Sequence, residues 1–257
     1  MSASNGPDDG SSAPKTALLI HGLTGSNGEM HELAQLLVQR HFRVTNLNLL
    51  GHGTTIEDLK RVPLEKWRAQ CLAAMVDLGP GPAVCIGLSF GALLALDLAE
   101  QFPESVKQCV LLSPAFQLRT RSAEILISAL SVLPEWILDH LGEIKKKDNA
   151  AARLSVPRTA YSSHALGALG RLGKLRRLCF QNAGKVTAKL LIISDPADHR
   201  LSSQSPSCLE GLLRTAPEYA VFTGAQHEMT CGPLRHSVFD RILRFLALDS
   251  ESNPTNT

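Results

Sequence analysis

The pentapeptide from Gly87 to Gly91 has the residue types of a serine nucleophile on a sharp turn. Its sequence, Gly-Leu-Ser-Phe-Gly, follows an apolar run at 83–88 and opens a helical pattern at Phe90. Glycines on both sides of Ser89 permit a tight strand-to-helix turn. The hydroxyl would project at a helix N-terminus, where negative charge is favoured. The pattern predicts Ser89 as the nucleophile of an acyl-transfer site, with an ordinary structural turn as the alternative.

A second glycine-rich segment, His-Gly-Leu-Thr-Gly-Ser at 21–26, follows the apolar run at 16–20. Loops of this kind aim backbone N–H groups into the crevice at the carboxyl ends of parallel strands. The N–H groups of Leu23 and Phe90 would together stabilise the oxyanion of a tetrahedral intermediate. The alternative is a plain strand-to-helix turn. His21 is interpreted as a structural histidine that holds this loop.

A serine nucleophile needs a general base and an acid that orients the base. His227 lies in a loop after the last apolar run, where it can reach the serine. Two acids follow the preceding run: Asp195 is interpreted as a turn cap, and Asp198 lies farther along the loop. We predict Asp198 as the acid, so Asp198→Asn should lower kcat severely and Asp195→Asn barely. Surface or core roles are assigned to His140, His164 and His236.

Apolar runs alternate with amphipathic helical patterns along most of the chain. Strands are predicted at 16–20, 42–48, 83–88, 106–112, 189–194 and 219–222, and helices at 29–41, 64–78, 90–101, 204–214 and 234–246. Continuous apolar runs are typical of parallel strands that are covered on both faces. The alternation therefore predicts an α/β fold with a mostly parallel, doubly wound sheet of about six strands.

The alternation breaks between Phe116 and Ala183, a stretch with helical patterns near 123–141 and 164–178 and no convincing strand. We interpret this stretch as a helical cap inserted into the core. The expected divisions are a core of 16–116 and 184–247, a cap of 117–183, and disordered tails of 1–15 and 248–257.

The cap contains apolar side chains that could roof the site. Leu133, Trp136 and Ile137 lie in the first helical pattern of the cap and are predicted to line a substrate pocket. The alternative is that this helix packs on the core or on a second protomer.

The cap also concentrates positive charge. Residues 143–177 contain nine basic and two acidic residues, a local net charge of +7 against +2 for the whole chain. One interpretation is a solvated surface. A second is a docking face for an anionic substrate or an acyl carrier, and a third is a basic patch that touches a membrane surface.

Composition excludes several other classes of protein. The near-zero net charge and the 5% aromatic content give no reason to expect nucleic-acid binding. Glycines interrupt the apolar run at 81–99, which favours a buried strand, a turn and a helix over a transmembrane segment. The six cysteines form no CxxC pair, and the N-terminus does not resemble a signal peptide, so we expect buried thiols and a cytoplasmic protein.

The sequence resembles the α/β-hydrolase superfamily, and within it the bacterial carboxylesterase and monoacylglycerol-lipase-like group. The resemblance rests on HGLTGS at 21–26, LGHGT at 50–54, GLSFGA at 87–92, SDPADH at 194–199 and the His227 loop. It implies a triad of Ser89, His227 and Asp198. It also implies oxyanion donors from Leu23 and Phe90, and a cap inserted after the sixth strand of the fold.

Two features depart from the family pattern. The strand hairpin that usually precedes the HG-bearing strand is replaced by a polar segment, so we expect the sheet to lack its first one or two strands. His-Arg-Leu-Ser follows Asp198, where an apolar pair and a proline are commoner.

Together these interpretations predict a serine hydrolase that cleaves carboxylic esters through an acyl-enzyme, without a metal or an organic cofactor. A second hypothesis is an acyl thioesterase or acyltransferase that docks an acyl carrier on the basic cap. A third is a non-catalytic binding protein with the hydrolase fold. The sequence leaves open the acyl chain, the leaving group and the oligomeric state.

Overall fold

The computed structural model describes residues 15–146 and 161–247. Six of its strands form one wholly parallel sheet in the order β2-β1-β3-β4-β7-β8. Their bounds are β1 Thr16–Ile20, β2 Arg43–Leu47, β3 Ala83–Leu88, β4 Val106–Leu112, β7 Lys189–Ser194 and β8 Glu218–Val221. The predicted six-stranded parallel sheet is confirmed. The residues assigned to disordered tails lie outside the described part of the chain, except Lys15.

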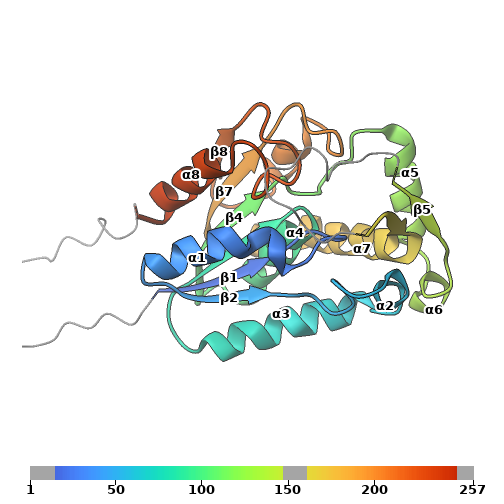
Figure 1. Cartoon of the computed structure of the whole chain (residues 1–257), viewed down its shortest axis with the longest axis horizontal. Helices are drawn as coiled ribbons and strands as arrows, with labels where there is room; N and C mark the ends of the chain where they lie inside the picture. Colours follow the sequence, from blue (N-terminus) through green and yellow to red (C-terminus); the bar gives the residue numbers. More distant parts are fainter. Residues whose placement is uncertain (1–14, 147–160, 248–257) are drawn as a thin grey trace, which may run out of the picture.

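Helices cover both faces of the sheet (Figure 1). One face packs against α1 (His31–Gln39) and α8 (Arg235–Ala247), and the other against α3 (Leu64–Leu78) and α4 (Phe90–Gln101). Strand β1 shows why its sequence is apolar throughout. Leu18 and Ile20 belong to one core cluster, whereas Ala17 and Leu19 belong to the other. A strand buried on both faces needs apolar side chains at every position.

The apolar run at 81–99 divides into β3, a turn at Ser89 and α4, as expected. Ten of the twelve residues of α4 are buried, because this helix lies between the sheet and the cap helix α7 (Leu166–Asn182). Its all-round apolar character therefore reflects burial in protein. Among the helices described, none has the length and the hydropathy needed to cross a membrane.

The core differs from the prediction at two elements. The helix expected at 204–214 is a short 3-10 helix, η4 (Ser205–Leu209), followed by turns. Gly211, with φ of +75°, adopts a left-handed conformation that stops a helix there. The unpredicted helix α2 (Ile56–Lys60) begins at Thr55, whose side chain forms a capping box with Asp58.

The cap between β4 and β7 is more divided than its sequence pattern indicates. One helix was expected at 123–141, but the chain forms α5 (Arg121–Leu130) and α6 (Glu135–Leu138), because Pro134 begins a new helix. The expectation of no strand was also wrong. Two short antiparallel strands, β5 (Glu143–Lys145) and β6 (Ser163–Ala165), precede α7. Figure 1 shows this group of elements at one end of the sheet.

Most of the described basic residues of the cap make contacts inside the protein. Arg171 is fully buried and forms ion pairs with Glu135 and Asp139, which hold α6 on α7. The remaining contacts join Lys146 to Thr24, Lys174 to Glu135, Arg176 to Glu124, and Arg177 to Ser131. The acidic partners lie in α5 and α6, outside 143–177, so the local count of +7 overstates the unpaired charge. Lys147, Arg153 and Arg158 lie outside the described residues.

The fold predicts a strict size limit at Gly91. A Cβ atom there would lie 2.3 Å from the Ile20 carbonyl oxygen and 2.5 Å from the His21 carbonyl oxygen. We expect Gly91→Ala to lower the free energy of unfolding by at least about 2 kcal/mol, because α4 and β1 must separate. Urea unfolding measures this change. The control is Gly142→Ala, where a Cβ meets nothing within 4 Å; equal losses in the two variants would contradict the expectation.

Candidate active site

Ser89 occupies the sharp turn between β3 and α4. Its φ of 57° and ψ of −109° are strained for a residue with a side chain. The turn is held by close backbone packing, since a Cβ at Gly87 would lie 2.1 Å from the Gly91 carbonyl oxygen. The Ser89 N–H also donates to the Leu112 carbonyl oxygen of β4 at 2.8 Å. The strained serine is therefore fixed at the carboxyl end of the sheet.

Loops after the last two strands bring His227 and Asp198 to this serine. The Ser89 hydroxyl lies 2.9 Å from His227 Nε2, and Nδ1 of the same ring lies 2.7 Å from Asp198 Oδ2. Both the imidazole and the carboxylate are buried. A buried imidazole that donates from Nδ1 to a carboxylate keeps Nε2 free to accept the serine proton. The three residues predicted as a triad therefore form one hydrogen-bonded chain.

The surroundings of Asp198 keep it ionised. Burial by itself would raise the pKa of this carboxyl group, but attraction to His227 and hydrogen bonds outweigh burial and bring the pKa to about 2. The second carboxylate oxygen accepts the backbone N–H groups of Arg200 at 2.7 Å and Leu201 at 3.1 Å. These two donors fix the direction in which the other oxygen faces His227.

Asp195 has a larger role than the turn cap that the sequence indicates. Its Oδ1 accepts the N–H of Ala197 at 2.8 Å, as a turn cap would. Its Oδ2 accepts the N–H groups of Gly224 at 3.1 Å and Gln226 at 2.8 Å. Gln226 precedes His227 and has a left-handed φ of 68°. Asp195 thus ties the loop that carries Asp198 to the loop that carries His227.

The two predicted oxyanion donors are the backbone N–H group of Phe90, which directly follows Ser89, and that of Leu23, whose loop lines the same cavity as Ser89. Within the described residues neither N–H has a hydrogen-bond acceptor, whereas the neighbouring Gly22 N–H donates to Glu29 Oε2 at 3.1 Å. The carboxylate of Glu29 lies under the loop, where a Cβ at Gly25 would be 2.1 Å from Glu29 Oε1. Two N–H groups that have no acceptor in the protein can receive an oxyanion.

Two buried histidines hold the loop that carries Leu23. His21 Nδ1 lies 2.8 Å from the Gly22 carbonyl oxygen, and its Nε2 accepts the Leu49 N–H at 3.0 Å. His52 Nε2 lies 2.6 Å from the Leu23 carbonyl oxygen. Burial lowers the pKa of both rings to about 4, so both are neutral near pH 7. The structural role predicted for His21 agrees with these contacts.

A stack of rings connects the two oxyanion candidates. The ring centroid of His52 lies 4.8 Å from that of His21 and 5.6 Å from that of Trp67. Trp67 in turn lies 5.3 Å from Phe90. Because His52 holds Leu23 and Trp67 packs on Phe90, one buried stack supports both N–H donors. The segment LGHGT, quoted above for the family resemblance, thus has a physical role, and Trp67 shares it.

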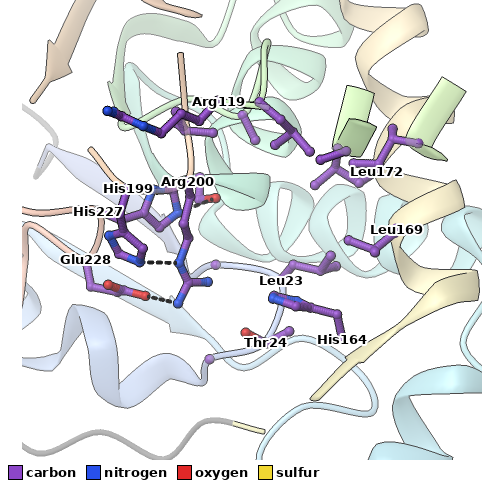
Figure 2. Close-up of a pocket in the computed structure, with 18 of the residues that line it drawn as sticks. Leu23, Thr24, Arg119, His164, Leu169, Leu172, His199, Arg200, His227 and Glu228 are labelled. Atoms are coloured by element: carbon purple, nitrogen blue, oxygen red, sulfur yellow. Dashed lines mark hydrogen bonds and ion pairs between the residues drawn. The ribbon is translucent and has the colours of Figure 1, made fainter. Parts of the chain in front are cut away.

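A cavity of about 440 Å³ opens onto Ser89 (Figure 2). Its apolar lining from the cap comes from α5, α7, β5 and the segment before α5. The residues are Leu118, Ala123, Leu126, Ile127, Ile144, Leu169 and Leu172. Leu133, Trp136 and Ile137, which were predicted to line a substrate pocket, are not among the residues that line this cavity, and Trp136 is 68% exposed. The interruption of the helix at Pro134, between α5 and α6, directs this segment away from the cavity.

Several polar residues of the cavity were not predicted from the sequence. His164, assigned a surface or core role, lines the cavity together with Arg119, His199, Arg200 and Glu228. Three of them are sequence neighbours of the triad, since His199 and Arg200 directly follow Asp198 and Glu228 directly follows His227. Their adjacency to the predicted triad was the available signal. Among the described residues, no group of histidine, cysteine and acidic side chains could hold a metal ion.

A parallel sheet with a serine on a strand-to-helix turn, and with an acid and a histidine on the loops after the last two strands, is the arrangement of α/β hydrolases. A family model described as "alpha/beta hydrolase fold" matches residues 16–149 of the chain. The chain therefore belongs to this family, which confirms the resemblance seen in the sequence.

Individual relatives are lipolytic proteins. The chain is 26% identical over 243 residues to a thermostable monoacylglycerol lipase of Bacillus sp., with 91% of each chain covered. It is 32% identical over 157 residues to Lipase LipV of Mycobacterium tuberculosis, a match that spans 58% of this chain and 56% of LipV.

Solved structures share the fold. One, from a description of the metagenome-derived lipolytic enzymes LipS and LipT, has a TM-score of 0.79 at 23% identity and covers 91% of this chain and 94% of that chain. A monoacylglycerol lipase of Paleococcus ferrophilus has a TM-score of 0.75 at 19% identity, with the same coverage.

The two aspartates should respond differently to the same substitution. We expect Asp198→Asn to lower kcat by about 10³- to 10⁴-fold, because the base loses the charge that orients it. Asp195→Asn should lower kcat by no more than about tenfold and cost about 1–3 kcal/mol of stability, because an amide cannot accept all three N–H groups. Steady-state kinetics and thermal unfolding separate the effects. A larger loss of kcat in Asp195→Asn would reassign the acid.

Stability should fall as the solution becomes acidic. The pKa values of His21 and His52 lie near 4 in the folded chain, against 6.5 for a free imidazole. Between these values the unfolded chain binds more protons, so the unfolding free energy is lost as the pH falls from 6.5 toward 4. Replacing His52 with Gln should reduce this slope by about one proton, about 1.4 kcal/mol per pH unit. Chemical unfolding at several pH values measures the slope, and parallel curves would contradict the assignment.

Proposed function

We propose that the protein is a serine hydrolase that cleaves carboxylic esters. The observation that carries this proposal is the hydrogen-bonded chain from Ser89 through His227 to Asp198. Of these residues, Ser89 and His227 line the cavity. The relatives that are named as lipases support an ester as the substrate.

In the proposed reaction His227 accepts the Ser89 proton as the Ser89 oxygen attacks the ester carbonyl carbon. The oxyanion that forms is stabilised by the N–H groups of Leu23 and Phe90. His227 then gives the proton to the alcohol oxygen, and the bond between that oxygen and the carbonyl carbon breaks. Water, activated by the same imidazole, releases the acid from the acyl-enzyme and restores Ser89. Asp198 orients and stabilises the imidazolium in both steps.

The acyl chain of the substrate is proposed to lie against the cap. The apolar side chains from α5 and α7 form one wall of the cavity, and a volume of about 440 Å³ is in the range of small-molecule sites. Burial of the chain against these side chains contributes about 0.8 kcal/mol for each CH₂ group. A small or medium-length acyl chain fits this wall.

An acyl carrier is a less favoured partner. The cap cations that suggested a carrier-docking face are bound to Glu124, Glu135, Asp139 and other internal groups in the described residues. Paired cations attract a distant anion weakly. Among the described residues, the thioesterase alternative therefore lacks most of the unpaired charge on which it depended.

A fluorophosphonate probe tests the proposal. The probe should label the wild-type chain at Ser89, and Ser89→Ala should abolish labelling and lower kcat for p-nitrophenyl butyrate by at least about 10⁴-fold. The matched control is Ser203→Ala, which removes an exposed hydroxyl from a turn. A folded wild-type chain that is neither labelled nor active would overturn the proposal, as would an active Ser89→Ala variant.

A further inference from the structure

Arg200 places a guanidinium group inside the cavity, on the wall beside the proposed base (Figure 2). Its Nε donates to His199 Nε2 at 3.1 Å, and its Nη2 lies 2.9 Å from Glu228 Oε1. The third nitrogen, Nη1, has no partner in the described part of the chain. Figure 2 shows it pointing away from both partners, toward His164 and Leu23. The loop that departs from the family pattern thus supplies a free N–H donor to the site.

His164 of β6 faces this guanidinium across the cavity and has an unsatisfied nitrogen. Its Nδ1 is buried and has no hydrogen-bond partner in the described residues. Leaving a buried polar atom unpaired costs about 1–3 kcal/mol, unless a ligand supplies the partner. Arg200 and His164 therefore both line the cavity, and each has a nitrogen without a partner in the described residues.

The local charge favours an anion in that space. Burial, and then the positive charges of Lys146 and Arg200, lower the pKa of His164 to about 3, whereas Glu228 opposes them with a smaller effect. The imidazole is neutral near pH 7 and offers one N–H. At this wall the Arg200 guanidinium supplies positive charge, and the Glu228 carboxylate lies beside it. A carboxylate or phosphate accepts charge-assisted hydrogen bonds from such donors.

The position of this polar wall identifies the part of the ester that it would contact. His227 must give its proton to the leaving alcohol oxygen, so the alcohol portion lies on the His227 side. The ring centroids of His199 and His227 are 6.3 Å apart, and the Arg200 side chain is hydrogen-bonded to the His199 ring. Leu169 and Leu172 lie on the opposite side in Figure 2 and belong to the apolar wall.

We propose that Arg200 and His164 form a specificity site for an anionic group, a carboxylate or a phosphate, on the alcohol portion of the ester. The anion accepts hydrogen bonds from Arg200 Nη1 and from the N–H of His164, while the acyl chain lies against the cap. This inference rests on the proposed ester-hydrolase function and narrows its substrate class.

Paired substrates test the inference. Carboxymethyl butyrate carries a carboxylate on its alcohol portion, and carbamoylmethyl butyrate is its neutral amide counterpart. We expect the wild-type kcat/KM to be at least about tenfold higher for the carboxylate. A third ester, 2-phosphoethyl butyrate, distinguishes the two anions, since it should exceed the carboxylate if phosphate is the preferred group. Acid release in a pH-stat measures all three rates.

Two variants assign any preference to these side chains. His164→Ala breaks no ion pair, and Arg200→Met removes the donor; each should reduce the anion preference to within about twofold. The double variant Arg200→Met/Glu228→Gln avoids leaving the buried Glu228 carboxylate without its Arg200 partner. The control is Arg121→Met, which removes one charge from an exposed arginine outside the cavity and should keep the full preference.

The outcomes separate this inference from the proposed function. If the wild-type kcat/KM for carbamoylmethyl butyrate equals the values for both anionic esters, the anion site is overturned and the proposed function stands. A preference that persists in both His164→Ala and the Arg200 variants also overturns it. A chain that hydrolyses no ester, p-nitrophenyl butyrate included, overturns the proposed function and this inference together.

Discussion

The contact that fixes the site is the backbone packing of α4 against the carboxyl end of β1. Gly91 has no room for a Cβ atom because the carbonyl groups of Ile20 and His21 lie against it. This approach forces Ser89 into a left-handed conformation and brings Phe90 beside the loop that carries Leu23. Burial of ten residues of α4 provides the hydrophobic free energy that offsets this local strain. Ser89, its turn and both oxyanion candidates depend on this one contact.

The remaining groups of the site are oriented in advance by hydrogen bonds to the backbone. Asp195 joins the loops after β7 and β8, and Asp198 receives two N–H groups before it meets His227. On the other side of Ser89, neutral His52 holds the Leu23 carbonyl group. Dipoles and charges that are already oriented need no costly reorganisation when charge develops during a reaction. The rigid loops therefore suit the chemistry that we propose.

Local sequence signals predicted the elements that these contacts require. The bounds of β1, β3, β4, β7, α3 and α4 agree with the predicted ranges, because continuous apolar runs and helical periodicity report burial directly. Ser89, Asp198 and His227 were chosen from their positions after strands, and the structure places them within hydrogen-bond distance of one another. Their catalytic roles remain predictions.

The cap was harder to predict, because its contacts link residues that are distant in the sequence. Pro134 divides one apolar pattern into two helices, and this changes which side chains reach the cavity. The acids that neutralise Arg171 and Arg176 lie before the basic stretch, so counting charge in a window missed them. Arg200 and His164 line the same cavity because a loop of the core and a strand of the cap face each other. No local pattern carries that information.

The most direct test of the account is a crystal structure of the chain after reaction with a phosphonate ester. The account predicts a bond from phosphorus to Ser89 Oγ, with the phosphoryl oxygen about 3 Å from the N–H groups of both Leu23 and Phe90. His227 should lie within hydrogen-bond distance of the Ser89 oxygen or of the remaining ester oxygen. An adduct on another residue, or a phosphoryl oxygen directed away from both N–H groups, would contradict it.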